Sequence, residues 1–313
     1  MRIAILGATS QIAKDLVRSF HAHGSDELVL YARRPDAVTE WLSTVGLPER
    51  YTVADFEAFS ATEHFDAILN FVGVGNPAQA AAMGSSIFEV TLQYDELALN
   101  YVRQHPRCRY IFLSSGAAYG SNFDEPVDEN SQAIVAINSL HPQDWYGAAK
   151  MHAECRHRSL PHLPIVDIRV FNYFSHTQDM TARFLITDIL RAIQSGETLV
   201  TSSDNISRDY IGSEDFFQLV AAILGSPARN GVVDCYSQAP TDKTALLAMA
   251  GDNFGLAVQL TEASTGLNAT GMKRNYYSLN HRAAAFGYQP QKSSLELIFQ
   301  EISALTNRTT GRP

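Results

Sequence analysis

The sequence predicts an α/β fold, in which helices cover both faces of a doubly wound parallel sheet, followed by a smaller mixed α/β lobe. Two observations predict it. Short apolar runs alternate with helical patterns through the first half of the chain, and this alternation is typical of parallel strands joined by helices. The chain has 313 residues, of which 45% are hydrophobic, and such a chain can bury a large core.

The predicted strands all lie before residue 170. They are residues 3–6, 28–31, 51–53, 67–71, 110–114 and 165–169. The segment between the first two has an apolar stripe beginning at Ile12, which predicts a core-facing helix, and Gly24 is expected to end it. Longer helical patterns cover residues 87–103 and 145–157. This order of elements is that of a doubly wound domain.

The alternation weakens after about Asn172, where helical segments mix with stretches rich in glycine, serine and asparagine. We therefore expect a first domain over residues 1–172, with segments near 214–236 returning to its sheet. A smaller lobe is expected over residues 173–213 and 237–313.

Composition excludes several classes of partner. The net charge is −9, and no run of lysine or arginine could neutralise phosphates along a duplex, so nucleic acid is not an expected partner. Cys108, Cys155 and Cys235 lack the spacing of a metal site, so we expect no metal and reduced thiols in a cytoplasmic protein. No apolar stretch approaches the roughly 20 residues of a membrane helix, so neither export nor membrane anchoring is expected.

The turn after the first strand is where such a fold presents backbone amides and a helix dipole to a pyrophosphate. It reads Gly7-Ala8-Thr9-Ser10-Gln11-Ile12-Ala13. The residues assigned to cofactor binding in this turn are Gly7, Thr9, Ser10, Gln11 and Ile12. Ser10 and Ala13 stand where the dinucleotide motif usually has glycine, so a tight turn without a ligand is the alternative.

The end of the second strand indicates which cofactor is bound. An acidic residue there binds the ribose of NAD, whereas arginine suits the ribose phosphate of NADP. The chain has Arg33 and Arg34 after Ala32, so NADP is expected in preference to NAD, the alternative being two solvated arginines. After the third strand, Asp55 and Phe56 are assigned to the adenine, although Asp55 also suits a helix cap.

A tyrosine and a lysine at the start of a predicted helix carry the strongest signal for catalysis. Tyr146 and Lys150 are four residues apart, so the phenol and the ammonium share one helix face. An exposed helix pair is the alternative for this spacing alone. Upstream, however, the 110–114 strand is followed by Ser115, whose hydroxyl is expected at the carboxyl edge of the sheet, where ligands bind.

In this arrangement the chain resembles the extended short-chain dehydrogenase/reductase family, which modifies nucleotide-linked sugars on a Rossmann domain. Nearly the whole chain is covered. The further segments that carry the resemblance are Arg169-Val170-Phe171-Asn172, Arg208-Asp209-Tyr210-Ile211 and Ala285-Phe286-Gly287-Tyr288-Gln289-Pro290. The resemblance implies that Ser115, Tyr146 and Lys150 are catalytic, with Tyr146 and Lys150 also contacting the cofactor.

The resemblance also implies a substrate site. Asn172 and Arg208 match positions that usually touch the nucleotide diphosphate, and Arg274 lies where a further phosphate-binding arginine often falls. Ser115 is expected to contact the sugar. A strand-end cap, a surface ion pair and a solvated loop arginine are the respective alternatives for Asn172, Arg208 and Arg274.

Departures from the family pattern narrow the reaction. Gly116 and Ala117 stand where the dehydratases of the family carry an acidic pair, so 4,6-dehydration is not expected. We predict a 4-ketoreductase that makes a deoxysugar nucleotide. A nucleotide-sugar epimerase with tightly bound NAD is the first alternative, and a non-catalytic NADP-sensing protein is the second. A homodimer is common among the proteins that the chain resembles.

Overall fold

A parallel sheet forms the larger lobe of the computed structural model, which describes residues 1–24, 26–47, 50–74, 80, 82–262 and 273–310. The strands of the sheet are β1 (Arg2–Leu6), β2 (Glu27–Tyr31), β3 (Thr52–Ala54), β4 (Ala67–Asn70), β5 (Arg109–Ser115), β6 (Ile165–Val170) and β11 (Gly231–Asp234). Their order is β11-β6-β5-β4-β1-β2-β3, and every neighbouring pair is parallel. The predicted fold class is confirmed.

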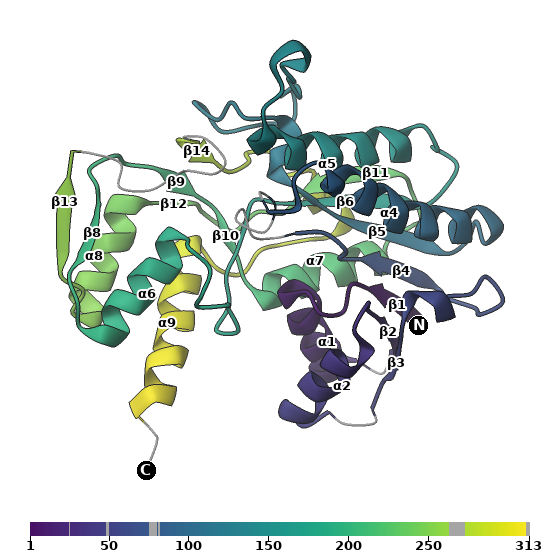
Figure 1. The fold of residues 1–313 in the computed structure, drawn as a ribbon, viewed down its shortest axis with the longest axis horizontal. Coiled ribbons are helices and arrows are strands. Elements are labelled where there is room, and N and C mark those ends of the chain that lie inside the picture. Colours follow the sequence, from purple (N-terminus) through teal and green to yellow (C-terminus); the bar gives the residue numbers. More distant parts are fainter. Residues whose placement is uncertain (25, 48–49, 75–79, 81, 263–272, 311–313) are drawn as a thin grey trace.

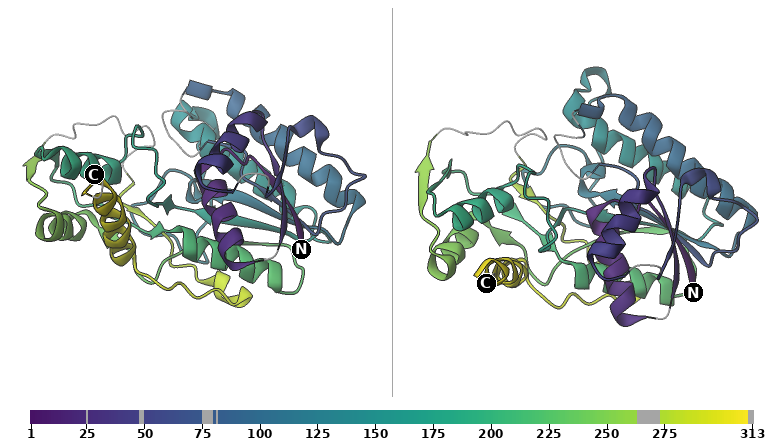
Figure 2. Two further views of the ribbon diagram at one scale, coloured as in Figure 1. Left: turned by 90° about the horizontal axis from the view of Figure 1, so that it is seen from below. Right: turned by 60° about the horizontal axis from the view of Figure 1, so that its bottom comes forward.

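Helices cover both faces of this sheet (Figures 1 and 2). One face carries α1 (Gln11–His23), α2 (Pro35–Thr44) and α7 (Ser213–Gly225), and the other carries α4 (Ser86–Gln104) and α5 (Pro142–Arg158). Side chains of β1 alternate between the two cores: Ile3 and Ile5 pack in one, Ala4 and Leu6 in the other. A strand that is buried on both faces is mostly apolar, and this explains the continuous apolar runs of strands such as β1 and β2.

The order of the strands indicates at which edge of the sheet a ligand is expected to bind. From β1 the chain builds the sheet in one direction through β2 and β3, and in the other through β4, β5 and β6. In open sheets of this kind, ligands bind outside the carboxyl ends of the strands at the point where the order reverses. The turns after β1, β2 and β5 therefore meet at one edge.

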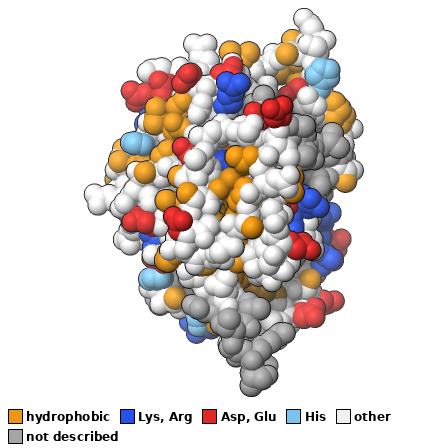
Figure 3. Space-filling view, turned by 90° about the vertical axis from the view of Figure 1, so that its left-hand side faces the viewer, with side chains coloured by type: hydrophobic (Ala, Val, Ile, Leu, Met, Phe, Trp, Pro, Cys, Tyr) orange, Lys and Arg blue, Asp and Glu red, His pale blue; other side chains and the backbone are white. Residues whose placement is uncertain are grey.

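The smaller lobe has its own core, formed by residues such as Leu190, Leu246 and Ile298. Its elements are β7 (Asn172–Tyr173), α6 (Leu185–Ser195), β8 (Leu199–Ser202), β9 (Ser207–Arg208), β10 (Tyr210–Ile211), β12 (Thr241–Asp242), α8 (Lys243–Phe254), β13 (Val258–Thr261), β14 (Asn275–Tyr276) and α9 (Ser294–Thr310). On its outer face, hydrophobic side chains form a central strip among charged groups (Figure 3).

The two lobes are connected by segments that cross more than once. After β14 the chain returns to the larger lobe, where Ala283 and Tyr288 enter the core beside α7. The division into domains at residues 172, 213 and 237 stays a prediction, and residues 263–272 and 311–313 of the expected smaller lobe lie outside the described residues. No helix in the described ranges is long and apolar enough to cross a bilayer.

Candidate active site

The turn between β1 and α1 has the shape of a dinucleotide-binding turn. Gly7 has φ +83°, and a Cβ there would lie 2.8 Å from the Val72 backbone nitrogen, so only glycine fits. Ser10 is the N-cap of α1, but its side chain makes no capping hydrogen bond. The first amides of α1 are thus left to a ligand such as a pyrophosphate. The side-chain amide of Gln11 donates a hydrogen bond to the Ser175 hydroxyl at 3.1 Å.

Three cationic side chains lie at the end of β2. Arg33 and Arg34 are both exposed, and no carboxylate in the described residues forms an ion pair with either. Lys14, on the second turn of α1, is close enough to Arg34 that, after burial, the guanidinium is the next cause lowering the pKa of Lys14. Sequence reasoning missed Lys14, although it follows Ser10 by one helical turn and so lies beside the same helix terminus.

The two residues assigned to the adenine follow β3. Asp55 is exposed and caps a 3₁₀ helix, Phe56–Ala58, by accepting a hydrogen bond from the Ala58 amide at 3.0 Å. In the structure, the carboxylate of Asp55 thus acts as a helix cap, as the alternative interpretation expected. Phe56 packs against the ring of Tyr94, with centroids 4.5 Å apart.

Ser115 and Tyr146 converge at the carboxyl end of β5. Ser115 is the last residue of the strand, and its hydroxyl accepts a hydrogen bond from the Ala117 amide at 3.2 Å. Helix α5 can approach this turn because residue 147 is glycine: a Cβ there would lie 2.4 Å from the Ala117 carbonyl oxygen. The close approach brings Tyr146 next to Ser115, whose hydroxyl partly offsets the rise that burial causes in the pKa of Tyr146.

Lys150 lies one turn further along α5, beneath the tyrosine. Its ammonium donates to the Leu113 carbonyl at 2.7 Å and lies 6.0 Å from the centroid of the Tyr146 ring. Burial lowers the pKa of Lys150 to about 8, and the carboxylates of Asp95, Glu154 and Asp167 raise it part of the way back. A lysine without those carboxylates would lose its charge more easily.

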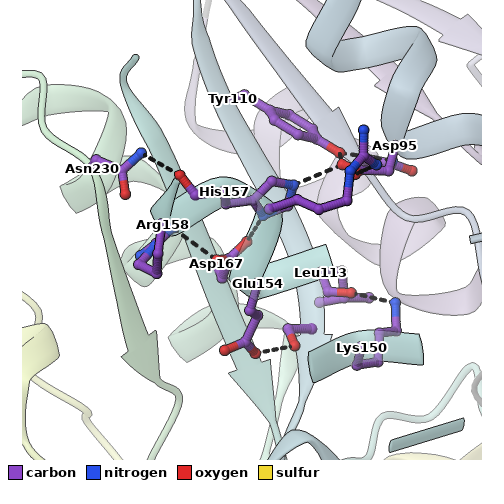
Figure 4. Close-up of polar contacts among 12 residues, drawn as sticks. Asp95, Tyr110, Leu113, Lys150, Glu154, His157, Arg158, Asp167 and Asn230 are labelled. Atoms are coloured by element: carbon purple, nitrogen blue, oxygen red, sulfur yellow. Dashed lines mark hydrogen bonds and ion pairs between the residues drawn. The ribbon is translucent and has the colours of Figure 1, made fainter. Parts of the chain in front are cut away.

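Toward the C-terminal end of α5, beyond Lys150, the buried face of the helix carries a row of charged groups (Figure 4). Glu154 accepts a hydrogen bond from the hydroxyl of Ser114, the neighbour of Ser115, and forms an ion pair with Arg169. His157, one turn further, is fully buried between two carboxylates. Its Nδ1 lies 2.6 Å from Asp167 Oδ1 and its Nε2 lies 2.7 Å from Asp95 Oδ1.

Both ring nitrogens of His157 face acceptors, which only an imidazolium satisfies with two ionised carboxylates. Burial alone would lower the pKa of His157, but Asp167 and Asp95 outweigh it and raise the pKa to about 9. Arg156 and Arg158 pair with the outer oxygens of the same two carboxylates. Sequence reasoning missed this cluster, because its members come from α4, α5 and β6.

The smaller lobe adds a second tyrosine to the site. Tyr276 lies in β14, which pairs with β9 so that Tyr276 is opposite Arg208. The Tyr276 hydroxyl is 3.3 Å from the Ser115 hydroxyl, and burial raises the pKa of Tyr276 far above its ordinary value. No local pattern in the sequence marks this residue, since the strand has only two residues.

The three residues predicted to bind the diphosphate lie around this tyrosine in different ways. Asn172 donates to the Asp209 carbonyl at 3.0 Å. The Arg208 guanidinium donates to the Ser207 carbonyl at 2.7 Å and lies 5.9 Å from the centroid of the Tyr276 ring. Arg274 is exposed. Their roles toward a substrate stay predictions.

These features fit a nicotinamide dinucleotide. The Gly7 cradle and uncapped α1 terminus suit the pyrophosphate, and Lys150 lies beside Tyr146, where the nicotinamide ribose would be held. Within the described residues no group of three or more histidine, cysteine, aspartate or glutamate side chains is arranged to hold a metal ion.

Solved structures with the same fold include nucleotide-sugar enzymes. A mutant of UDP-glucuronic acid 4-epimerase from Bacillus cereus, with NAD and a fluorinated UDP-sugar, has a TM-score of 0.78 and 16% identity over 98% of this chain and 100% of that chain. UDP-N-acetylglucosamine 4-epimerase from Methanobrevibacter ruminantium has a TM-score of 0.79 and 17% identity, covering 98% of each chain. dTDP-glucose 4,6-dehydratase from Bacillus anthracis, with NAD, has a TM-score of 0.77 and 13% identity over 99% of this chain and 98% of that chain.

Sequence comparison gives the family. A search of curated protein sequences finds no match. The family model of the NAD dependent epimerase/dehydratase family matches residues 3–236, which is well over half of the chain. This confirms the resemblance on which the site residues were assigned. The chain belongs to the NAD-dependent epimerase/dehydratase family.

Proposed function

We propose that this protein transfers a hydride between a nicotinamide cofactor and a carbon of a nucleotide-linked sugar, and that it works as a 4-ketoreductase. The observation that carries the proposal is the convergence of Ser115, Tyr146 and Lys150 at the carboxyl end of β5. A hydroxyl, a phenol and an ammonium in this order can bind a sugar oxygen, move its proton and hold the ribose of the cofactor.

Tyr146 is the proton donor of the proposed reduction. When bound, the reduced cofactor supplies a hydride to the carbonyl carbon. Tyr146 donates its phenolic proton to the carbonyl oxygen, so that a C–H and an O–H bond form as the C=O π bond breaks. Ser115 donates a hydrogen bond to the same oxygen. Burial raises the pKa of Tyr146, and the hydroxyl of Ser115 partly offsets this rise.

Lys150 prepares the tyrosine for the next turnover. After the proton has left, the phenolate is stabilised by the nearby ammonium, and a proton from solvent restores the phenol. The carboxylates that raise the pKa of Lys150 help to keep the ammonium charged near neutral pH.

The proposed cofactor is NADP. Arg33 and Arg34 place two positive charges directly after β2, Lys14 of α1 lies near Arg34, and Ala32 stands where an acidic residue would bind the ribose of NAD. Such charges suit charge-assisted hydrogen bonds to a ribose phosphate. The structural neighbours contain NAD, so a preference for NADP would be a difference between this chain and them.

The proposed substrate is a nucleotide-linked sugar whose diphosphate lies near Asn172, Arg208 and Arg274. The structural neighbours with UDP-glucuronic acid, UDP-N-acetylmuramic acid and UDP-glucose support this substrate class. The same neighbours favour a second candidate function, 4-epimerisation, because several of them are 4-epimerases of nucleotide sugars.

Replacement of one phenol tests the proposed chemistry. Tyr146→Phe removes the proton that is transferred but little of the surface that binds the cofactor. Turnover should fall by roughly 100- to 10,000-fold, which is the usual value of general acid catalysis, while NADPH affinity stays nearly constant. Tyr51→Phe is the control, since its hydroxyl contacts His21 and Arg50, neither of which is assigned to the site. Near-normal turnover in Tyr146→Phe would remove this residue from the mechanism.

A further inference from the structure

A buried lysine in the smaller lobe has no role in the reaction described so far. Lys273 is 8% exposed, and its ammonium lies 4.4 Å from the centroid of the Tyr276 ring and 5.0 Å from that of Phe123. In the part of the chain that the structure describes, no carboxylate lies within ion-pair distance of it. A buried ammonium held only by two aromatic faces is costly to keep charged.

Lys273 lines a pocket beside the proposed catalytic residues. Small residues form two of its walls: Ala117 and Ala118 follow Ser115, and Gly147 and Ala148 follow Tyr146. Lys273 is the one lysine or arginine among the described lining residues. The pocket therefore adjoins the turns that follow Ser115 and Tyr146, and its charged lining residues are Lys273 and Asp144.

A second cation lies on the same tyrosine ring. The Arg208 guanidinium is 5.9 Å from the centroid of Tyr276, and its hydrogen bonds go to the backbone carbonyls of Ser207 and Arg274. Burial and then Arg208 lower the pKa of Lys273 to about 8, against a smaller opposing effect of Asp144. The two cations thus repel each other, and an anion near both would offset both the repulsion and the burial.

From this geometry we propose that Lys273 binds an anionic oxygen group of the substrate, in the pocket beside Ser115. The proposal rests on the proposed function, because it takes the ligand to be a nucleotide-linked sugar. Two sources of the same chemistry fit the pocket: the diphosphate of the nucleotide, shared with Arg208, or a carboxylate on the sugar itself.

The test measures binding without turnover, so that it is independent of the reaction. Dissociation constants are measured by calorimetry for inorganic pyrophosphate, UDP-glucose and UDP-glucuronic acid, with the wild type, Lys273→Met and Lys273→Arg. Lys292→Met is the matched control, because it also loses one ammonium but lies outside the pocket. NADPH affinity and the urea midpoint of each variant show whether the fold is intact.

Loss of a charge-assisted hydrogen bond should weaken binding roughly 10- to 100-fold in Lys273→Met, with partial recovery in Lys273→Arg. Weaker binding of pyrophosphate and UDP-glucose identifies the diphosphate as the ligand group, and weaker binding of UDP-glucuronic acid alone identifies the sugar carboxylate. Wild-type and Lys273→Met affinities that agree for all three probes would overturn the proposal, as would a wild type that binds none of them.

Discussion

At the scale of single residues, the proposed preference for NADP depends on Lys14, Arg33 and Arg34. Arg33 and Arg34 follow β2, and burial and the charge of Arg34 lower the pKa of Lys14 on α1. Like charges gathered on one side of a cofactor site repel one another unless an anion is bound. A phosphate on the adenosine ribose would relieve this repulsion, whereas a free ribose hydroxyl would not.

Replacement of Arg33 and Arg34 by alanine should therefore weaken NADPH binding roughly 10- to 100-fold and change NADH binding little, because the lost contacts are charge-assisted hydrogen bonds to a phosphate. Titration of both reduced cofactors checks this. Arg183→Ala, which removes a largely exposed guanidinium elsewhere, is the control. Equal losses for NADPH and NADH would refute the assignment.

At the scale of elements, α5 is fixed by charge on its buried face. Lys150, Glu154 and His157 occupy successive turns of this face, where most helices carry apolar residues. Each is matched by a group from a neighbouring element, as His157 is by Asp95 of α4 and Asp167 of β6. A rotation of the helix would break these ion pairs, so they hold Tyr146 and Lys150 in position.

This cluster predicts a dependence of stability on pH. The pKa of His157 is about 9 in the folded protein against 6.5 for a free side chain. Because the folded value is raised, the stabilisation is complete below pH 6.5 and is lost as the pH rises through about 9. The difference in free energy of unfolding between wild type and His157→Gln should shrink by roughly 3 kcal/mol over this range.

Urea denaturation of both proteins, below pH 6.5 and above pH 9, measures this difference. The comparison with the variant is needed because the lowered pKa of Lys150 acts in the opposite sense, raising stability as the pH rises from about 8. That contribution is present in both proteins and so largely cancels. A difference that does not change with pH would mean that His157 is neutral and that one of its carboxylates carries the proton.

The sequence predicted the elements of the sheet well, for a physical reason. Strands buried on both faces tend to be continuous apolar runs, so residues such as 3–6 and 28–31 stand out against their polar surroundings. The charged face of α5 could not be predicted in this way. His157 and Arg158 look like a solvated helix end until α4 and β6 bring Asp95 and Asp167 against them.

At the scale of the whole molecule, the candidate site is closed by segments distant in sequence. Ser115 and Tyr146 come from the larger lobe, whereas Arg208, Lys273 and Tyr276 come from short strands and loops of the smaller one. The first two could be proposed from the sequence, because a strand end and a helix start fix their positions. Tyr276 could not, since only long-range strand pairing with β9 places it beside Ser115, and Lys273 reaches the site through its contact with the Tyr276 ring.

The central claim is that the protein reduces a nucleotide-linked keto sugar and does not interconvert two nucleotide-sugar epimers. A reductase consumes reduced cofactor, whereas an epimerase returns its hydride to the same sugar within one turnover. The arginines after β2 favour reduction with NADPH, while the structural neighbours favour epimerisation.

The ratio of NADPH oxidised to product formed distinguishes a reductase from an epimerase most directly. The protein is incubated with NADPH and a panel of nucleotide-linked 4-keto-6-deoxyhexoses, and the loss of reduced-nicotinamide absorbance is compared with the product formed. Oxidation of one NADPH for each product molecule is the predicted result. Interconversion of two nucleotide sugars by purified protein that carries bound NAD, with no net change in cofactor, would contradict it.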